Sequence, residues 1–252
     1  MEQQLFDVLM VAMPLLAIVV FIALFFVKAG YGLFRTDKWG FSIDNKIAWV
    51  CMEAPVFFVM LFLWWRSSVR FEVVPLICFL LFELHYFQRS FVFPCLGKSR
   101  MPVAIMSMGI VFNLLNGFMQ GEWLFYLAPD GMYSAEWLSH PCFWIGVLIF
   151  LMGMIINWHS DHVIRSLRKP GDTKHYLPVK GMYKYVTSGN YFGEFLEWVG
   201  FAVLTASPAA WVFVLWTFAN LAPRAHAIRN RYREEFGREA VGNRKRMIPF
   251  IY

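Results

Sequence analysis

The chain has 252 residues, of which 59% are hydrophobic, 19% aromatic and 16% charged, and its formal net charge is +6. Soluble globular domains carry more charge and fewer apolar residues, so this composition excludes that class and predicts an integral membrane protein. The positive charge does not indicate a nucleic-acid partner, because basic residues also gather on the cytosolic face of membrane proteins. Nothing in the sequence indicates an obligate protein partner, whereas contact with membrane lipid is expected.

Membrane-spanning helices are recognised in sequences as windows of about 18 or more mostly apolar residues. The chain offers seven candidates: residues 5–27, 47–65, 73–93, 103–120, 141–158, 191–204 and 210–225. The last two are shorter than the others and lie so close together that they predict a tight helical hairpin. No connecting segment has room for a soluble domain. We therefore expect residues 1–252 to form one membrane-embedded domain, an all-α bundle of seven transmembrane helices.

The basic residues predict how this bundle is oriented. With seven spans, one side of the membrane receives four basic segments, whereas the other receives only Arg66 and Arg70. The segment 121–140, on that second side, contains no lysine or arginine. Because cytosolic loops carry the excess of basic residues, the N-terminus is predicted outside the cytosol and the C-terminus inside it. The membrane would be the endoplasmic reticulum in a eukaryote and the inner membrane in a bacterium.

Two polar side chains inside the predicted spans are candidates for chemistry. Glu53 has apolar residues on both sides, and a charged carboxylate at the centre of a span costs about 2.5–3.5 kcal/mol on insertion scales. It must therefore face the bundle interior and be either paired or protonated, and a neutral carboxylic acid can donate a hydrogen bond to a carbonyl oxygen. Tyr86 brings a phenolic donor to the third span. The structural alternatives are a buried acid satisfied by a neighbouring helix and an interfacial tyrosine anchor.

The densest group of polar side chains begins at Asn157, near the end of the fifth predicted span. Asp161 lies four residues further on and Arg168 follows about two turns later, so the three side chains continue roughly along one helix face. Asn190 and Glu194 open a second polar group around the start of the sixth span. Taken alone, such a stripe is equally typical of an ordinary ion-paired helix end.

The end of the last predicted span and the tail that follows it continue the pattern with Arg224 and Tyr232. Guanidinium groups bind phosphate through two parallel hydrogen bonds, and amides and acids suit a ribose or a nicotinamide. The chain has no Gly-x-Gly-x-x-Gly motif and no Walker loop. Any dinucleotide must therefore be held by the helical bundle itself.

Several motifs follow one another along the chain: Ala48-Trp49 with Glu53-x-Pro55, Leu84-His85-Tyr86-Phe87, Asn116-Gly117-x-x-Gln120-Gly121, Gly153-Met154-x-Ile156-Asn157-x-His159-Ser160-Asp161, Leu167-Arg168-Lys169-Pro170-Gly171, and Gly193-Glu194-x-x-Glu197-Trp198. Their joint pattern closely resembles the steroid 5α-reductases over nearly the whole chain after the first span. The resemblance implies a 3-oxo-5α-steroid 4-dehydrogenase with seven transmembrane helices that uses NADPH and neither flavin nor metal. It also implies hydride transfer to C5 of a Δ4-3-keto steroid of the testosterone or progesterone type, with a proton delivered at C4.

The resemblance assigns expected roles to individual residues. Glu53 and Tyr86 match the pair that hydrogen-bonds the steroid C3 carbonyl, where they would polarise the enone and stabilise the developing enolate. The apolar steroid pocket would be lined by Trp49, Phe112 and Tyr191. Positions that match contacts of NADPH are Asn157, Asp161, Arg168, Asn190, Glu194, Arg224 and Tyr232, with Arg100 as an additional phosphate contact.

The chain departs from the family pattern at a few of these positions. His175 and Tyr176 stand where the family usually has Tyr-Arg among the contacts of the cofactor. Met52 stands where animal members commonly have glutamine, and His226 is what is left of a histidine cluster after Arg224. These changes concern contacts of the 2′-phosphate and thus the preference for NADPH over NADH.

A second family offers an alternative interpretation of the C-terminal half. Residues 188–193, followed by a hairpin and Arg231-x-x-Glu234-Glu235-Phe236, are similar to the membrane isoprenylcysteine carboxyl methyltransferases, which use S-adenosylmethionine. Methyl transfer does not need to polarise a steroid ketone, so the combination of Glu53 with Tyr86 favours the reductase. In a non-enzymatic sterol-binding protein, the intramembrane acid and the arginines would have no function.

Overall fold

The computed structural model describes residues 2–34, 36–96, 100–168, 172 and 174–252, so the last three residues of the predicted motif 167–171 lie outside it. A helix overlaps each of the seven predicted ranges: α1 Glu2–Phe26, α2 Asn45–Arg66, α3 Val73–Phe87, α4 Val103–Glu122, α5 Pro141–Ser166, α6 Gly189–Thr205 and α7 Pro208–Phe236. Helices α5 and α7 extend well beyond the predicted ends at 158 and 225. π-helical turns extend α3 through Gln88–Val92 and α4 through Trp123–Leu127. The short helix α8, Arg238–Val241, follows α7.

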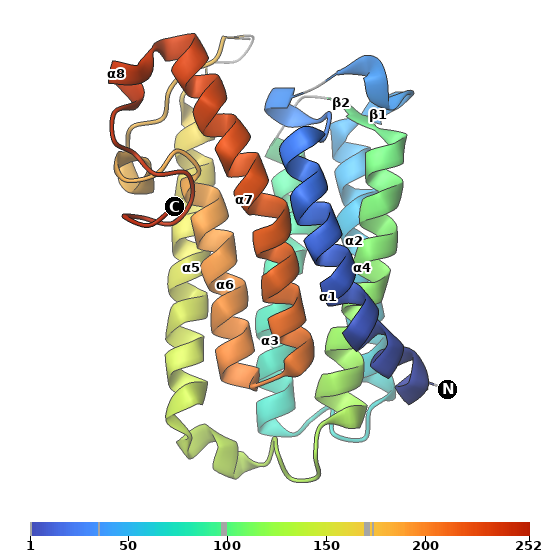
Figure 1. The fold of residues 1–252 in the computed structure, drawn as a ribbon. Helices are drawn as coiled ribbons and strands as arrows, with labels where there is room; N and C mark the ends of the chain where they lie inside the picture. Colours follow the sequence, from blue (N-terminus) through green and yellow to red (C-terminus); the bar gives the residue numbers. More distant parts are fainter. Residues whose placement is uncertain (1, 35, 97–99, 169–171, 173) are drawn as a thin grey trace.

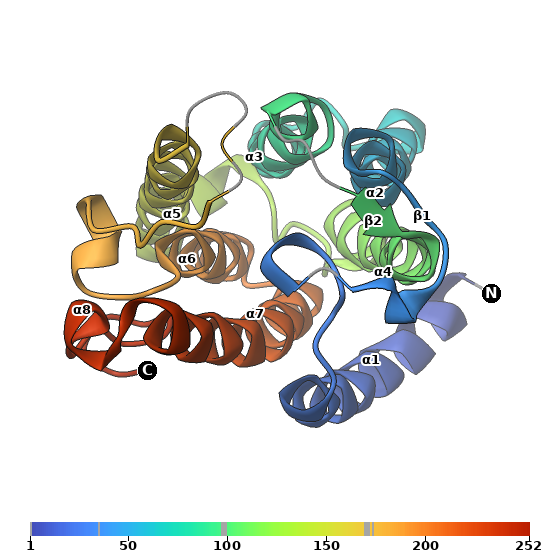
Figure 2. The same cartoon turned by 90° about the horizontal axis from the view of Figure 1, so that it is seen from above.

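The seven long helices run along one another as a bundle, with α8 and two short strands at one end (Figure 1). Seen from that end, α5, α3 and α2 lie along one side and α7 and α1 along the opposite side, with α6 and α4 between them (Figure 2). The most extensive helix pairs are α5 with α6, α2 with α4, and α1 with α7. We call the end that carries α8 and the strands the α8 end of the bundle.

Within the described part of the chain, four helical segments are long and apolar enough to cross a membrane: Glu2–Phe26, Asn45–Arg66, Val103–Leu127 and Pro141–Ser166. Helix α1 leaves large apolar side chains such as Val8, Leu16 and Phe26 exposed, which suits contact with lipid. Helices α3 and α6 have 15 and 17 residues, and α7 is long but carries several basic side chains in its second half. The structure is thus that of a mostly helical membrane protein.

The all-α prediction is wrong in one detail, because the structure contains two short strands. β1, Ser42–Asp44, pairs antiparallel with β2, Arg100–Pro102, with Ser42 opposite Pro102 and Asp44 opposite Arg100. The two strands directly precede α2 and α4, and the side-by-side packing of these helices brings their leading segments together. Three residues are too few to show the alternation that predicts a strand from sequence.

The contact between α5 and α6 is unusually close because glycines lie in it. A Cβ atom at Gly193 would collide with the backbone of Asn157, and a Cβ atom at Gly153 would collide with the backbone of α6 at Glu197. Small residues allow such close approach of helices in membrane proteins. This approach places the polar side chains of α5 directly against those of α6.

The predicted hairpin between the last two spans is confirmed. Helix α6 ends at Thr205 and α7 begins at Pro208, so only two residues connect them. Ala206 takes the left-handed conformation at φ +48°, and the hydroxyl of Ser207 accepts a hydrogen bond from the Ala210 amide at 3.2 Å, which caps α7.

Candidate functional site

The facing surfaces of α5 and α6 bring three predicted site residues into one hydrogen-bonded group. Asn157 donates from Nδ2 to the backbone carbonyl of Asn190 at 2.9 Å, and Asn190 donates from its own Nδ2 to Asp161 Oδ1 at 3.1 Å. The hydroxyl of Tyr183 donates to Asn190 Oδ1 at 3.3 Å. Asn157 and Asp161 are buried, so these contacts hold them in place inside the bundle.

Arg89 joins this group to α3, although it is not among the residues predicted from the sequence. Its guanidinium lies 3.2 Å from Glu194 Oε2 and 3.8 Å from Asp161 Oδ2. The same group lies over the rings of Trp49 and Phe93, 5.5 and 4.7 Å from their centroids. Arg89 belongs to the π-helical turn that follows α3, and such turns occur frequently at functional sites. One signal was present in the sequence, because Arg89 lies three residues after Tyr86.

A second buried polar pair lies between α3 and α6. The imidazole of His85 and the carboxyl group of Glu197 form a hydrogen bond, and both side chains are almost fully buried. The His85 ring also packs against Trp198 at 4.6 Å and against Tyr86 at 5.0 Å, measured between ring centroids. The pair therefore fixes the helix turn that carries Tyr86.

The two proposed carbonyl donors, Glu53 and Tyr86, lie on α2 and α3 and are both contacted by α4. Asn113 Nδ2 lies 3.2 Å from Glu53 Oε2, and Asn116 Nδ2 lies 3.4 Å from the Tyr86 hydroxyl. Because Asn113 and Asn116 are three residues apart, they share one face of α4 and bring the acid and the phenol to the same region. The Tyr86 ring packs on Phe82 with centroids 4.8 Å apart.

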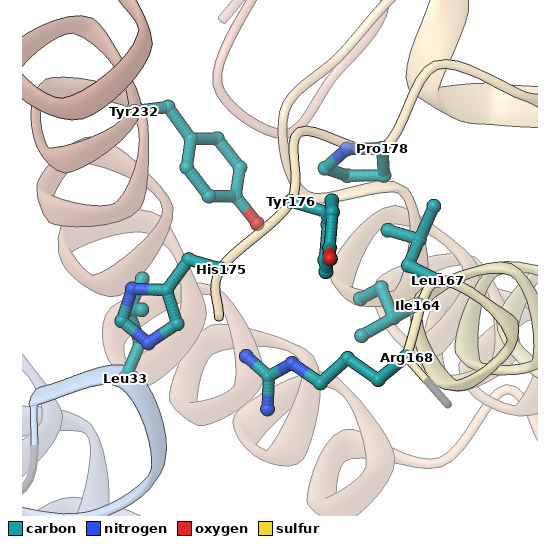
Figure 3. Close-up of a pocket in the computed structure, with 8 residues that line it drawn as sticks. All are labelled: Leu33, Ile164, Leu167, Arg168, His175, Tyr176, Pro178 and Tyr232. Carbon is teal, nitrogen blue, oxygen red and sulfur yellow. The ribbon is translucent and has the colours of Figure 1, made fainter. Parts of the chain in front are cut away.

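A cavity opens at the α8 end of the bundle and contains four predicted cofactor residues. In Figure 3, the side chains of Arg168, His175, Tyr176 and Tyr232 surround it, and Leu33, Ile164, Leu167 and Pro178 complete the lining. Burial raises the pKa of Tyr232 to about 12, so this phenol keeps its proton at neutral pH. The cavity thus offers a guanidinium, an imidazole and two phenols to a ligand.

Two residues that line the cavity, His175 and Tyr176, are held in place by hydrogen bonds to residues outside it. Nδ1 of His175 lies 3.0 Å from a carboxylate oxygen of Glu235 on α7. The hydroxyl of Tyr176 donates to Asp172 Oδ2 at 2.8 Å. Hydrogen bonds from the Lys174 amide and from Tyr176 lower the pKa of Asp172, so its carboxylate stays ionised and continues to accept. The segment that carries His175 is therefore attached to α7.

Arg224 on α7 contacts Tyr191 on α6 and Tyr31, which precedes α2. It donates from Nε to the Tyr191 hydroxyl at 2.8 Å and from a terminal nitrogen to the Tyr31 carbonyl at 3.0 Å. The guanidinium lies 3.9 Å from the centroid of the Tyr31 ring, and that ring in turn contacts Trp49 with centroids 6.2 Å apart. Tyr191 and Trp49, predicted to contact a steroid, are thus linked to a residue predicted to contact the cofactor.

Two further predicted residues do not line the cavity of Figure 3. Phe112 packs on Trp216 and Phe213, with ring centroids 4.8 and 6.0 Å apart, within the apolar core. Arg100 in β2 donates to the carbonyl of Ser42 in β1 and is exposed, and it does not line the cavity of Figure 3.

Several buried polar atoms near the α5–α6 group have no hydrogen-bond partner among the described residues: Asn157 Oδ1, Ser160 Oγ, Arg165 Nη1 and Ser188 Oγ. Buried polar atoms are normally paired, so this set indicates a bound polar ligand. A dinucleotide fits the donors and acceptors present, with cationic and aromatic side chains at the α8 end and amides and acids deeper in the bundle. A helical membrane bundle with such a site beside a half-buried acid and a buried phenol has the features of an oxidoreductase that acts on an apolar carbonyl compound.

The comparisons place the chain within this class, because it belongs to the 3-oxo-5-alpha-steroid 4-dehydrogenase family, whose model matches residues 99–252. It is 36% identical over 257 residues to steroid 5-alpha-reductase DET2 of Gossypium hirsutum, covering 100% of this chain and 99% of that protein. It is also 36% identical over 254 residues to 3-oxo-5-alpha-steroid 4-dehydrogenase 1 of Mus musculus, covering 99% and 98% of the two chains. The methyltransferase alternative is not supported by these relatives.

Proposed function

We propose that this chain is an NADPH-dependent 3-oxo-5α-steroid 4-dehydrogenase that reduces the Δ4 double bond of a 3-keto steroid. The observation that carries the proposal is the placement of Glu53 and Tyr86. They come from different helices, are both contacted by α4, and lie in a bundle whose facing α5 and α6 surfaces hold unpaired buried polar atoms. The membership of the family and the names of its relatives support the choice of steroid.

The two side chains would act on the steroid C3 carbonyl as hydrogen-bond donors. NADPH, when bound, would supply a hydride to C5 and leave as NADP⁺. The C4=C5 electron pair would then move towards C3, and negative charge would collect on the carbonyl oxygen. Glu53 and Tyr86 would stabilise that charge, and the resulting enolate would take a proton at C4 from water. Removal of one such donor in other enzymes lowers kcat by about 10²–10³.

The remaining polar residues divide by depth in the bundle. Arg168, His175, Tyr176 and Tyr232 would contact the phosphate and adenosine part at the α8 end, with Arg100 as a further phosphate contact. The amides and acids of the α5–α6 group suit the ribose and nicotinamide part, which Asn157, Asp161, Asn190 and Glu194 would contact. Arg224 would be a further contact of the cofactor. Trp49, Phe112 and Tyr191 would line the steroid pocket.

The proposal includes an arrangement in the membrane. All seven long helices would span it as one domain, with the N-terminus outside the cytosol and the C-terminus and the α8 end on the cytosolic face. The exposed apolar surface of α1 supports lipid contact, and the basic residues beyond α7 support the orientation. The membrane would be the endoplasmic reticulum in a eukaryotic host and the inner membrane in a bacterial one.

The test uses purified protein in detergent with NADPH and either testosterone or progesterone. We expect the 5α-dihydro product, and we expect Glu53→Gln to lower turnover by about 10²-fold or more while NADPH binding is retained, because a carboxamide of the same shape is a much weaker hydrogen-bond donor to the carbonyl than a neutral carboxylic acid. Glu83→Gln is the matched control. Glu83 is a buried acid of α3 that makes no hydrogen bond or ion pair to a proposed site residue among the described residues, so its replacement should leave turnover unchanged.

Two results would contradict the proposal. One is the absence of product with every Δ4-3-keto steroid tested, although the protein is folded. The other is methyl transfer from S-adenosylmethionine by the same preparation.

A further inference from the structure

Helix α4 carries three buried amide side chains on one face, spaced three and four residues apart. Asn113, Asn116 and Gln120 are 5%, 3% and 3% exposed, and α4 is otherwise largely apolar. We call these three residues the amide stripe. A buried amide must pair both its oxygen and its NH2 group, so each of the three has a defined orientation that can be read from its partners.

The orientations of Gln120 and Asn116 are fixed by a backbone carbonyl. Gln120 Nε2 lies 3.0 Å from the carbonyl oxygen of Ala209, which can only accept, so the NH2 group of Gln120 must point there. The second hydrogen of that group donates to Asn116 Oδ1 at 3.1 Å. This leaves the NH2 group of Asn116 facing the Tyr86 hydroxyl at 3.4 Å. The Tyr86 oxygen therefore accepts from α4, and its own proton is free to point elsewhere.

The orientation of Asn113 is fixed in the same way by a different carbonyl. Its Nδ2 lies 2.7 Å from the backbone oxygen of Met52, which again can only accept. The other hydrogen of that NH2 group points at Glu53 Oε2, 3.2 Å away. Oε2 must accept this hydrogen bond, so the proton of a neutral Glu53 belongs on Oε1.

We propose that the amide stripe is a set of positioning residues that makes Glu53 and Tyr86 donate together to the carbonyl oxygen of the substrate. The backbone carbonyls of Met52 and Ala209 fix the direction of each hydrogen bond along the stripe. As a result, Glu53 Oε2 and the Tyr86 hydroxyl oxygen both accept a hydrogen bond from α4. The proton on Glu53 Oε1 and the hydroxyl proton of Tyr86 are then both available to one ligand oxygen. This inference rests on the proposed function, in which that ligand is a 3-keto steroid.

The kinetic test replaces Asn113 and Gln120 with apolar residues of similar shape, Asn113→Leu and Gln120→Met. We expect each variant to lower kcat by about 10- to 100-fold, because the donors lose their preset direction, while the KM for NADPH stays near the wild-type value. Thr217→Val is the matched control, since Thr217 is a buried polar residue of α7 whose hydroxyl donates to the Phe213 carbonyl of the same helix. It should leave kcat unchanged. If Asn113→Leu does not fold, Asn113→Asp replaces it, because a carboxyl group of nearly the same shape cannot donate two hydrogen bonds.

A spectroscopic measurement separates positioning from general packing. The infrared C=O stretch of a Δ4-3-keto steroid labelled with ¹³C at C3 is recorded in the complex with NADP⁺, where no turnover occurs. Wild type and Thr217→Val should shift the stretch to lower frequency than in detergent alone, and the two stripe variants should lose most of that shift. A normal wild-type shift that both variants retain would overturn the role of the stripe alone. Absence of any shift in the wild type would overturn the stripe and the proposed function together.

Discussion

At the scale of single residues, Arg89 connects more of the site than any residue expected from the sequence. It lies within 4 Å of two acids on different helices, Asp161 and Glu194, and it acts electrostatically on Glu53 as well. Removing one partner of a buried ion cluster leaves charges unpaired, which costs about 3–5 kcal/mol in soluble proteins. The stability of the α3–α5–α6 contact should therefore depend strongly on this guanidinium.

We expect Arg89→Met to lower the thermal unfolding temperature clearly and to raise the KM for NADPH, because the buried Asp161 and the partly buried Glu194 lose their cation. The double variant Arg89→Met with Glu194→Gln should recover part of the stability, since one of the unpaired charges is removed. Thermal unfolding in detergent and initial rates at varied NADPH measure both effects. A double variant no more stable than the single one would show that Arg89 does not act through Glu194.

Glu53 and Tyr86 could be chosen as candidates from the sequence because a polar side chain is conspicuous inside an apolar span. Arg89 could not, because in the sequence it is one of several basic residues near the end of a predicted span. Asn113 was not predicted as a site residue for a related reason, because an amide in a membrane helix usually serves helix packing. Its partners, Met52 and Glu53, lie about 60 residues away in the sequence, and only the pairing of α2 with α4 brings them together.

At the scale of elements, the close approach of α5 and α6 sets the distance between Asn157 and Asn190. We expect Gly193→Ala to lower the unfolding temperature and to raise the KM for NADPH, because the added methyl group pushes against the Asn157 backbone. Gly200→Ala is the matched control, because it meets the α5 backbone at Phe150, away from the cofactor residues. It should lower the unfolding temperature with little change in KM. Equal changes of KM in both variants would contradict the local effect.

The C-terminal segment is a second element that supports the site. It bonds to residues 185–188 just before α6, through Lys245 and Arg246. Arg246 also donates from Nε to His226 Nδ1 at 3.0 Å, which requires an unprotonated nitrogen. Partial burial, helped by the nearby charges of Arg246 and Arg229, lowers the pKa of His226 below its ordinary value near 6.5.

This pKa shift predicts a pH dependence with a definite sign. Neutral His226 stabilises the folded state fully above pH 6.5, and that contribution is lost as the pH falls through the lower folded-state pKa. Amide hydrogen exchange of residues 244–252, corrected for intrinsic rates, should therefore speed up as the pH falls below about 6.5. His226→Gln keeps an acceptor for Arg246 without the titration and should flatten this dependence. An unchanged dependence in the variant would exclude His226 as its cause.

At the scale of the whole molecule, hydrophobic periodicity and window length were sufficient to place all seven long helices and the hairpin between α6 and α7. They could not place the pairs α2 with α4 and α5 with α6, because side-chain contacts between distant segments leave no periodic signal in one sequence. The glycines at 153 and 193 lie where α5 and α6 approach closely, but this is recognisable only when the backbone that faces each glycine is known. The positions of the individual helices therefore follow from local composition, whereas the site forms only when particular helices pair.

The orientation of the molecule can be tested together with cofactor access. The cavity lined by Arg168, His175 and Tyr232 lies at the α8 end, where the C-terminal half of α7 also lies (Figure 1). NADPH carries several negative charges and does not cross a lipid bilayer, so it can reach the cavity only from the face on which that end is exposed. In sealed vesicles with the cytosolic face outward, we expect added NADPH to support steroid reduction. A C-terminal epitope should be removed by added protease and an N-terminal epitope protected. Cleavage of both epitopes in intact vesicles would contradict an odd number of spans, and turnover only after permeabilisation would reverse the orientation.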